Sequence, residues 1–222
     1  MNLLRLLAGT TLLSLAAALP AAAVNKTESR DVTGFTGIAL AAPILVELVL
    51  GDKESLTLEG DERALAVLET VVEGDSLRIR IRRGAREWTS NWPNADKVRA
   101  KVTARSIKAV SIHGSGDIRS PQLSGDALAV QVSGSGDVKI GGGKVKTLSV
   151  NISGSGDVAA GRLEAQAVSV SIAGSGDATV WAKGSLAVKV AGSGDVGYYG
   201  DPTVAKSIAG SGDIKRLGAS PG

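Results

Sequence analysis

The chain has 222 residues, of which 25 are Lys or Arg and 22 are Asp or Glu, so its formal net charge is +3. A charge this small and this mixed excludes a dedicated nucleic-acid-binding protein. With 43% hydrophobic residues, the chain can bury a core. It has no cysteine and a single histidine, which excludes disulfide frameworks, thiol nucleophiles and nearly all imidazole metal sites.

Residues 1–23 have the features of a secretory signal peptide. Arg5 supplies a positive start, the run from Leu6 to Leu19 is apolar, and Ala21-Ala22-Ala23 provide small residues for cleavage. The apolar run is shorter than the roughly 20 residues that span a bilayer, and no second run follows, so we expect no transmembrane span after cleavage. The sequence predicts an exported protein that is periplasmic, on the cell surface or secreted.

Residues 24–105 lack a regular repeat, and we expect them to form irregular N-terminal coils with a hairpin and a loop. Asp61 is placed to cap a short helix. A turn at Glu73-Gly74-Asp75 joins two apolar segments, which form either a hairpin or two consecutive coil edges. The expected elements are strands at Ile44–Leu50 and Leu56–Glu59, a helix over Glu62–Leu68, the paired segments Val71-Val72 and Leu77–Ile81, a polar loop at Arg83–Asp96, and a strand at Lys97–Thr103.

Residues 106–222 contain a repeat, the tetrapeptide Gly-Ser-Gly-Asp. Seven of the 29 glycines precede Ser106 and 22 follow it. Successive copies are 20, 20, 20, 18 and 18 residues apart, which is typical of a solenoid whose units bury their apolar faces against each other. The copies begin at Gly114, Gly134, Gly154, Gly174, Gly192 and Gly210.

The segments before the repeats, such as LAVQV and LSVNI, are apolar at every second position, which is the period of a strand with one buried face. Coils of 18–20 residues are too short for a βαβ unit, so we expect an all-β parallel β-helix, or β-solenoid. Each Gly-Ser-Gly is then a corner. Lys206 and Lys108 stand where neighbouring coils have an apolar residue, and we interpret them as charges that protect the two ends of the stack.

Stacking in register places one aspartate of every repeat along a single edge. Carboxylates about 4.8 Å apart repel each other by roughly 0.9 kcal/mol in water, so backbone N–H bonds, hydroxyls, shared protons or a cation must offset the repulsion. Calcium prefers oxygen ligands, but the nonapeptide spacing of calcium-binding solenoids is absent, so we expect no cofactor and keep calcium as an alternative for this row. The row consists of Asp117, Asp137, Asp157, Asp177, Asp195 and Asp213.

Arg78, Arg80 and Arg82 alternate with isoleucines and face one side of a strand. They form either a charged edge strand or a contact for an anionic polysaccharide or another envelope component. Trp88 and Trp92 follow in the polar loop, where they either pack on an open end of the solenoid or stack on sugar rings. These five residues are the candidate ligand surface.

The run KVRAKVTARSIKAVSIHGSGDI, the SGSGDV blocks, SRDVTGFTGIAL and EGDSLRIRI together resemble the bacterial GIN domain family, the putative auto-transporter adhesin head domain. The likeness covers most of Ser29–Gly218. It implies a right-handed parallel β-solenoid, an exported bacterial protein and an adhesive role. The family supplies no catalytic residues.

We therefore expect a non-enzymatic, exported binding or structural module of the cell envelope. The alternative is a polysaccharide-processing enzyme on a parallel β-helix, because closely spaced carboxylates also occur in glycosidases. Catalysis requires two carboxylates in different environments, whereas the six aspartates are nearly equivalent. The sequence leaves the partner, the envelope layer and the oligomeric state open.

Overall fold

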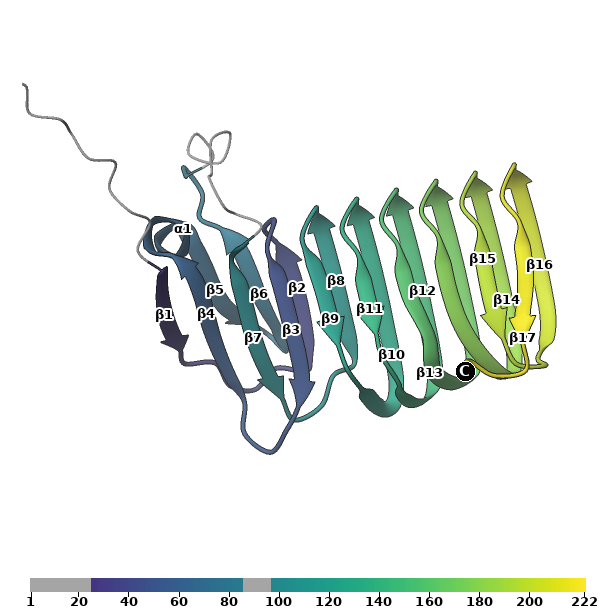
Figure 1. The fold of residues 1–222 in the computed structure, drawn as a ribbon, viewed down its shortest axis with the longest axis horizontal. Coiled ribbons are helices and arrows are strands. Elements are labelled where there is room, and N and C mark those ends of the chain that lie inside the picture. Colours follow the sequence, from purple (N-terminus) through teal and green to yellow (C-terminus); the bar gives the residue numbers. More distant parts are fainter. Residues whose placement is uncertain (1–24, 86–96) are drawn as a thin grey trace, which may run out of the picture.

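The computed structural model describes residues 25–85 and 97–222 and shows an elongated parallel β-solenoid (Figure 1). The predicted signal peptide, residues 1–23, lies outside the described residues, and so do Trp88 and Trp92. A continuous 17-stranded sheet wraps around one apolar core. The predicted all-β solenoid is thereby confirmed.

The C-terminal part of the solenoid is regular, with two long faces that meet at the Gly-Ser-Gly-Asp corners. Its strands pair in parallel from coil to coil, with spacings of 20 and then 18 residues, as expected. The strands are β8 (Ala109–Gly114), β9 (Asp117–Ser120), β10 (Leu123–Gly134), β11 (Val138–Ile140), β12 (Gly143–Gly154), β13 (Val158–Gly174), β14 (Ala178–Gly192), β15 (Val196–Tyr199), β16 (Thr203–Gly210) and β17 (Ile214–Gly218).

The predicted aliphatic columns are the core of this part. Val130, Val150 and Val170 are registered neighbours, and each is almost fully buried. On the opposite face, Val138 and Val158 align in the same way. β-Branched side chains fit such a stack because each one packs against its equivalent in the next coil.

The N-terminal half adds two coils whose spatial order differs from their order in the sequence. β2 (Gly37–Ala41) and β3 (Leu45–Leu50) lie between β8–β9 on one side and β6 (Ser76–Ile81) and β7 (Arg99–Ala104) on the other, all in parallel register. The chain therefore leaves the stack after β3 and returns one coil farther out. Lys108 belongs to an internal coil as a result, and its interpretation as an end-protecting charge was wrong.

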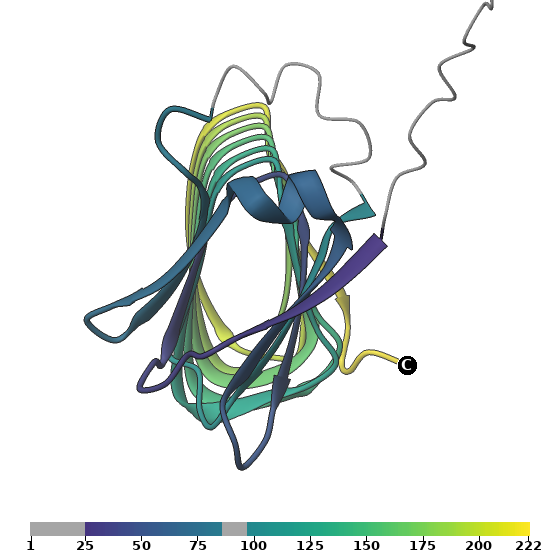
Figure 2. The same cartoon turned by 90° about the vertical axis from the view of Figure 1, so that its left-hand side faces the viewer.

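The end next to β6 and β7 is closed by β1 (Asn25–Arg30), β4 (Ser55–Asp61), α1 (Glu62–Val67) and β5 (Leu68–Glu73). Figure 2, which views the solenoid from this end, shows α1 and β1 crossing it. The Asp61 side chain accepts a hydrogen bond from the Arg63 backbone N–H at 2.8 Å, as expected for a helix cap. β5 and β6 pair antiparallel, so of the two interpretations of this segment the hairpin is correct.

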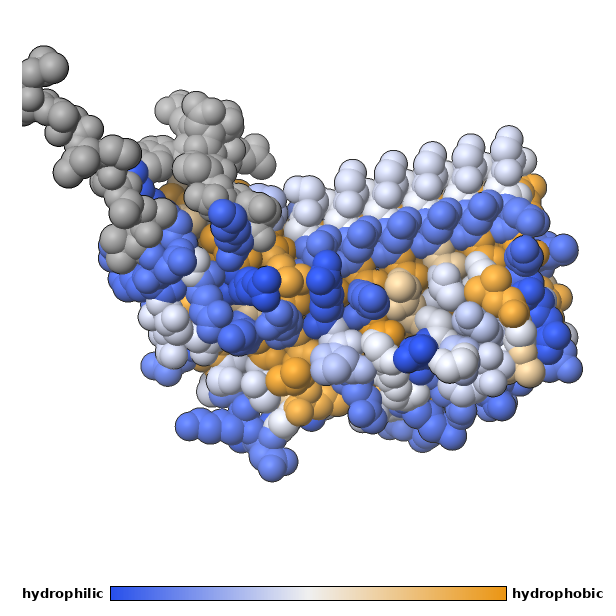
Figure 3. All heavy atoms as spheres, viewed as in Figure 1, coloured by the Kyte–Doolittle hydropathy of each residue, from blue (hydrophilic) through white to orange (hydrophobic). Residues whose placement is uncertain are grey.

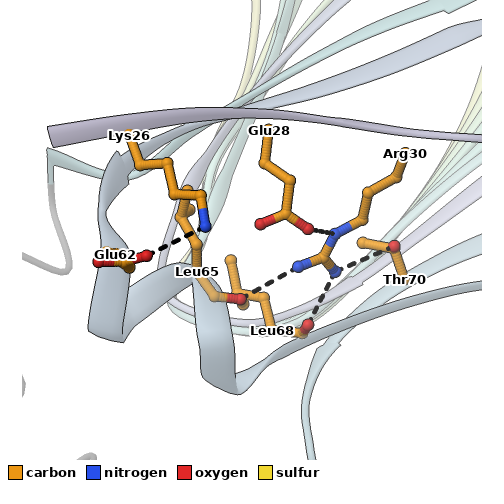
Figure 4. Close-up of polar contacts among 7 residues, drawn as sticks. All are labelled: Lys26, Glu28, Arg30, Glu62, Leu65, Leu68 and Thr70. Atoms are coloured by element: carbon orange, nitrogen blue, oxygen red, sulfur yellow. Dashed lines mark hydrogen bonds and ion pairs between the residues drawn. The ribbon is translucent and has the colours of Figure 1, made fainter.

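Arg30 holds this closing layer together (Figure 4). Its guanidinium donates to the carbonyl oxygens of Leu65 at 3.1 Å and Leu68 at 2.8 Å, at the end of α1. It also donates to the Thr70 hydroxyl at 3.1 Å and to the Glu28 carboxylate at 3.0 Å. One side chain on β1 thus links β1 to the end of α1 and to the start of β5.

Candidate functional site

The Gly-Ser-Gly corners are places where backbones of successive coils come too close for a side chain. Gly154 has φ of +132°, which favours glycine. A Cβ on Gly156 would overlap the carbonyl oxygen of Gly136 in the preceding coil. The N–H groups of Ser155 and Gly156 both donate to the Gly134 carbonyl, at 2.9 and 3.1 Å. Each corner is therefore a tight backbone contact between coils.

The aspartate of each repeat completes the hydrogen bonding at the corner. The Asp177 N–H donates to Oδ1 of Asp157 at 2.8 Å, and the Asp157 N–H donates to Oδ1 of Asp137 at 2.9 Å. The same bond recurs from Asp117 to Asp213. Backbone N–H groups are thus the partners that offset the repulsion along the row, and the carboxylates have a role in stability.

Replacing Asp157 by Ala tests this role. The change leaves the Asp177 N–H without its acceptor, so the free energy of unfolding should fall by about 1–2 kcal/mol. Asp157→Asn keeps an oxygen acceptor and should cost less than half as much. Urea denaturation followed by circular dichroism measures both variants. A gain of stability in Asp157→Ala would mean that repulsion dominates the row.

The prediction for the row was no cofactor, and calcium stays the alternative to it. Within residues 25–85 and 97–222, no group of three or more acidic or histidine side chains is arranged to hold a metal ion. One oxygen of each carboxylate is already bonded to the backbone of the chain. The row runs along the solenoid edge, and Figure 3 shows hydrophilic atoms in bands parallel to the long axis.

The predicted arginine surface lies near the closed end of the solenoid. Arg78 bonds Glu73 at 3.0 Å, and Arg80 bonds Glu69 at 2.9 Å and Glu73 at 3.3 Å. These partners lie on β5, which covers the outer edge of β6, so β6 is not the edge strand that one interpretation assumed. The hydrogen bond from Arg80 lowers the pKa of the Glu69 carboxyl. Two of the three guanidiniums are therefore already paired.

A second aromatic group, which the sequence patterns did not single out, lies on the outside of the last coils. Trp181 on β14 and Tyr199 on β15 are registered neighbours, and both are half-buried. A glycine on the neighbouring strand β13 makes space for one of the flat side chains, because a Cβ on Gly161 would crowd the Tyr199 ring. The sequence does contain a signal for this group, because Trp181 and Tyr199 are two aromatic residues that lie one coil length apart.

Charged side chains surround this aromatic group. Lys183 places its Nζ 5.7 Å from the centroid of the Trp181 ring, within range of a cation–π interaction. Glu164 is the registered neighbour of Trp181 on β13, and its carboxylate bonds Lys144 at 2.8 Å. That bond, assisted by the charge of Lys183, lowers the pKa of Glu164. We call Trp181, Tyr199 and Lys183 the aromatic platform.

A stack of parallel β-coils with one closed end and ladders of exposed side chains defines the protein as a β-solenoid with long outer surfaces. The family described as "Putative auto-transporter adhesin, head GIN domain" matches residues 34–202, more than half of the chain. The protein belongs to this family. None of the helices in residues 25–85 and 97–222 has the length and apolarity to cross a membrane.

Solved structures share the fold. A protein described as a putative adhesin from Bacteroides fragilis is 24% identical, with a TM-score of 0.71, and the match covers 87% of this chain and 97% of that one. Another from Parabacteroides merdae is 15% identical, with a TM-score of 0.55 and coverage of 87% and 96%. A protein described as a putative lipid binding protein from Parabacteroides distasonis is 23% identical, with a TM-score of 0.53 and coverage of 87% and 96%. No curated protein matches the chain.

Proposed function

We propose that the protein is an exported, non-enzymatic binding module of the bacterial cell envelope, with an adhesin-like role and an anionic polysaccharide as its ligand. Membership of the adhesin head-domain family supports the class of function. The predicted signal peptide supports export to the periplasm, the cell surface or the medium. The rigid stack of coils would present its outer side chains at fixed spacing to a repetitive partner.

The aromatic platform is the observation that carries the choice of ligand. Flat, partly exposed rings in adjacent coils offer apolar surface to the faces of sugar rings, while Lys183 offers a positive charge to carboxylate or sulfate groups. Arg82 and its neighbours Arg78 and Arg80 would form a second contact nearer the closed end. There, Glu69 and Glu73 compete for the latter two guanidiniums.

No observation favours the polysaccharide-processing enzyme over this proposal. Five of the six aspartates accept the same bond from the aspartate N–H of the next coil, so they lack the acid and base asymmetry that hydrolysis requires. A turnover assay decides between the two functions: release of reducing ends from the bound polymer would support the enzyme and overturn the proposal.

Binding to polygalacturonate, with neutral dextran as the control polymer, tests the platform. We expect Trp181→Ala to weaken polygalacturonate binding at least about tenfold, as truncation of a central aromatic contact does. Lys183→Gln should weaken it less and should reduce its dependence on salt. Isothermal titration calorimetry measures both effects.

Trp181→Phe is the matched control. In the described part of the chain, Nε1 of Trp181 is buried without a hydrogen-bond partner, so phenylalanine keeps a flat ring and loses no hydrogen bond. It should retain most of the affinity. Equal binding by Trp181→Ala and the wild-type protein would remove the platform from the proposal, and Arg82→Gln would then test the second contact.

A further inference from the structure

The C-terminal end of the solenoid is open, in contrast to the other end. β16 pairs only with β14, and β17 only with β15, so each strand has one edge with no neighbouring strand among the described residues. The last residues do not cross this end, because the Gly222 carbonyl accepts a hydrogen bond from Arg162 on β13 at 2.8 Å. Figure 1 shows the chain terminus turned back beside β13.

The aliphatic columns of the core are cut off at this end. Leu186 is 1% exposed, but Val204, its registered neighbour in the last coil, is 36% exposed. Val190 is 3% exposed and its neighbour Ile208 is 40% exposed. At the closed end the corresponding first coil is buried, with Leu77 and Ile79 fully covered. The open end therefore carries a short apolar strip next to unpaired backbone groups.

Lys206 lies in the middle of this strip. It continues the column of Val188, so its side chain occupies an inward position between those of Val204 and Ile208. No carboxylate of residues 25–85 or 97–222 forms an ion pair with it. A second copy stacked end to end would bring two Lys206 ammonium groups into one buried layer, and the cost of burying like charges disfavours that occupant.

We propose that the open end binds one extended strand of a partner protein, which pairs with β16 and places an acidic side chain over Lys206. Strand addition satisfies the free N–H and C=O groups of the edge. The strand must alternate apolar, acidic and apolar side chains on its inward face, to cover Val204, pair with Lys206 and cover Ile208. Unpaired backbone supplies affinity, and the single lysine supplies selectivity through charge complementarity.

A peptide that imitates one further coil tests the proposal. Its sequence is TVAESIAG, the sequence of β16 with Glu in place of the lysine, acetylated and amidated; the comparison peptide is TVAKSIAG. We expect the full-length mature protein to bind the Glu peptide about tenfold more tightly than the Lys peptide, because one ion pair replaces one repulsion. Fluorescence anisotropy of labelled peptides gives both dissociation constants.

Lys206→Glu should reverse the preference, and Lys206→Val should abolish it. Circular dichroism melts check that both variants fold, and the two peptides on the wild-type protein decide the matter even if a variant does not fold. Failure of both peptides to bind, equal binding of the two, or an unchanged preference in folded Lys206→Glu would overturn the proposal. So would a stable wild-type dimer in sedimentation velocity, which would identify a second copy as the occupant.

Polygalacturonate binding is independent of this result, because the aromatic platform and Lys206 lie on different surfaces. If the protein binds polygalacturonate but does not distinguish the two peptides, only the strand-binding proposal is wrong. If it distinguishes the peptides but does not bind polygalacturonate, only the proposed polysaccharide ligand is wrong.

Discussion

Gly156→Ala should destabilise the protein by at least about 4 kcal/mol or prevent its folding. The methyl group would overlap the Gly136 carbonyl oxygen and also crowd the Val132 side chain. Neither neighbour can move freely, since the carbonyl belongs to the backbone of the preceding corner and Val132 is fully buried. Because every corner stacks on the one before it, a shift at one corner propagates into its neighbours. Equilibrium urea denaturation measures the loss.

Gly125→Ala is the matched control for this substitution. Gly125 lies on β10, and a Cβ there would meet only the Ile107 carbonyl oxygen, at 4.0 Å. The change should leave stability the same or raise it by up to about 1 kcal/mol, since alanine reduces the entropy of the unfolded chain. Similar losses in the two variants would show that glycine content, and not close backbone approach, governs the corners.

Arg30→Ala should cost about 2–4 kcal/mol and loosen the closing layer first. The Arg30 side chain is 19% exposed, and its four hydrogen bonds to Glu28, Leu65, Leu68 and Thr70 would all be lost. We expect faster amide exchange in α1 and β5 than in the regular coils, because β1 would no longer be fastened to them. Hydrogen exchange followed by mass spectrometry, together with urea denaturation, measures the effect.

Two variants separate the effect of the hydrogen bonds of the Arg30 guanidinium from the effect of its positive charge. Arg30→Lys keeps the charge but cannot reach both carbonyls in a fork, so it should recover no more than half of the loss. Lys26 lies on the same strand as Arg30, and Lys26→Ala removes its exposed ion pair with Glu62. This change should alter stability by less than about 1 kcal/mol. If Arg30→Ala and Lys26→Ala changed the free energy of unfolding equally, the hydrogen bonds in Figure 4 would not stabilise the closing layer.

The regular coils could be predicted because their interactions connect equivalent residues. A valine that stacks on the valine 20 residues earlier leaves a period in the sequence, and so does a glycine that must stay clear of the previous glycine. Strand alternation then fixed which side chains face the core. The row of aspartates followed from the same period, although its hydrogen bonds to the next coil were only one of several alternatives.

The N-terminal half could be predicted only element by element. The strand at Leu45–Leu50, the Asp61 cap and the β5–β6 hairpin depend on neighbours in the sequence, and the local patterns indicated each of them. The pairing of β2 with β8 joins segments about 70 residues apart and leaves no period. The partners of Arg78 and Arg80 are likewise set by the hairpin, and no spacing rule selects Glu69 and Glu73 in advance.

The sequence by itself determined the parallel solenoid, its coil length, its core columns and its glycine corners. A contact that recurs in every coil requires the same type of residue once per coil, and this produces a period in the sequence. Only the tertiary structure decided which coil lies outermost, which end is closed, and where Trp181 meets Tyr199. Those features are single, non-repeated contacts between distant segments. Their geometry depends on how the whole chain packs, and a one-dimensional pattern carries no record of it.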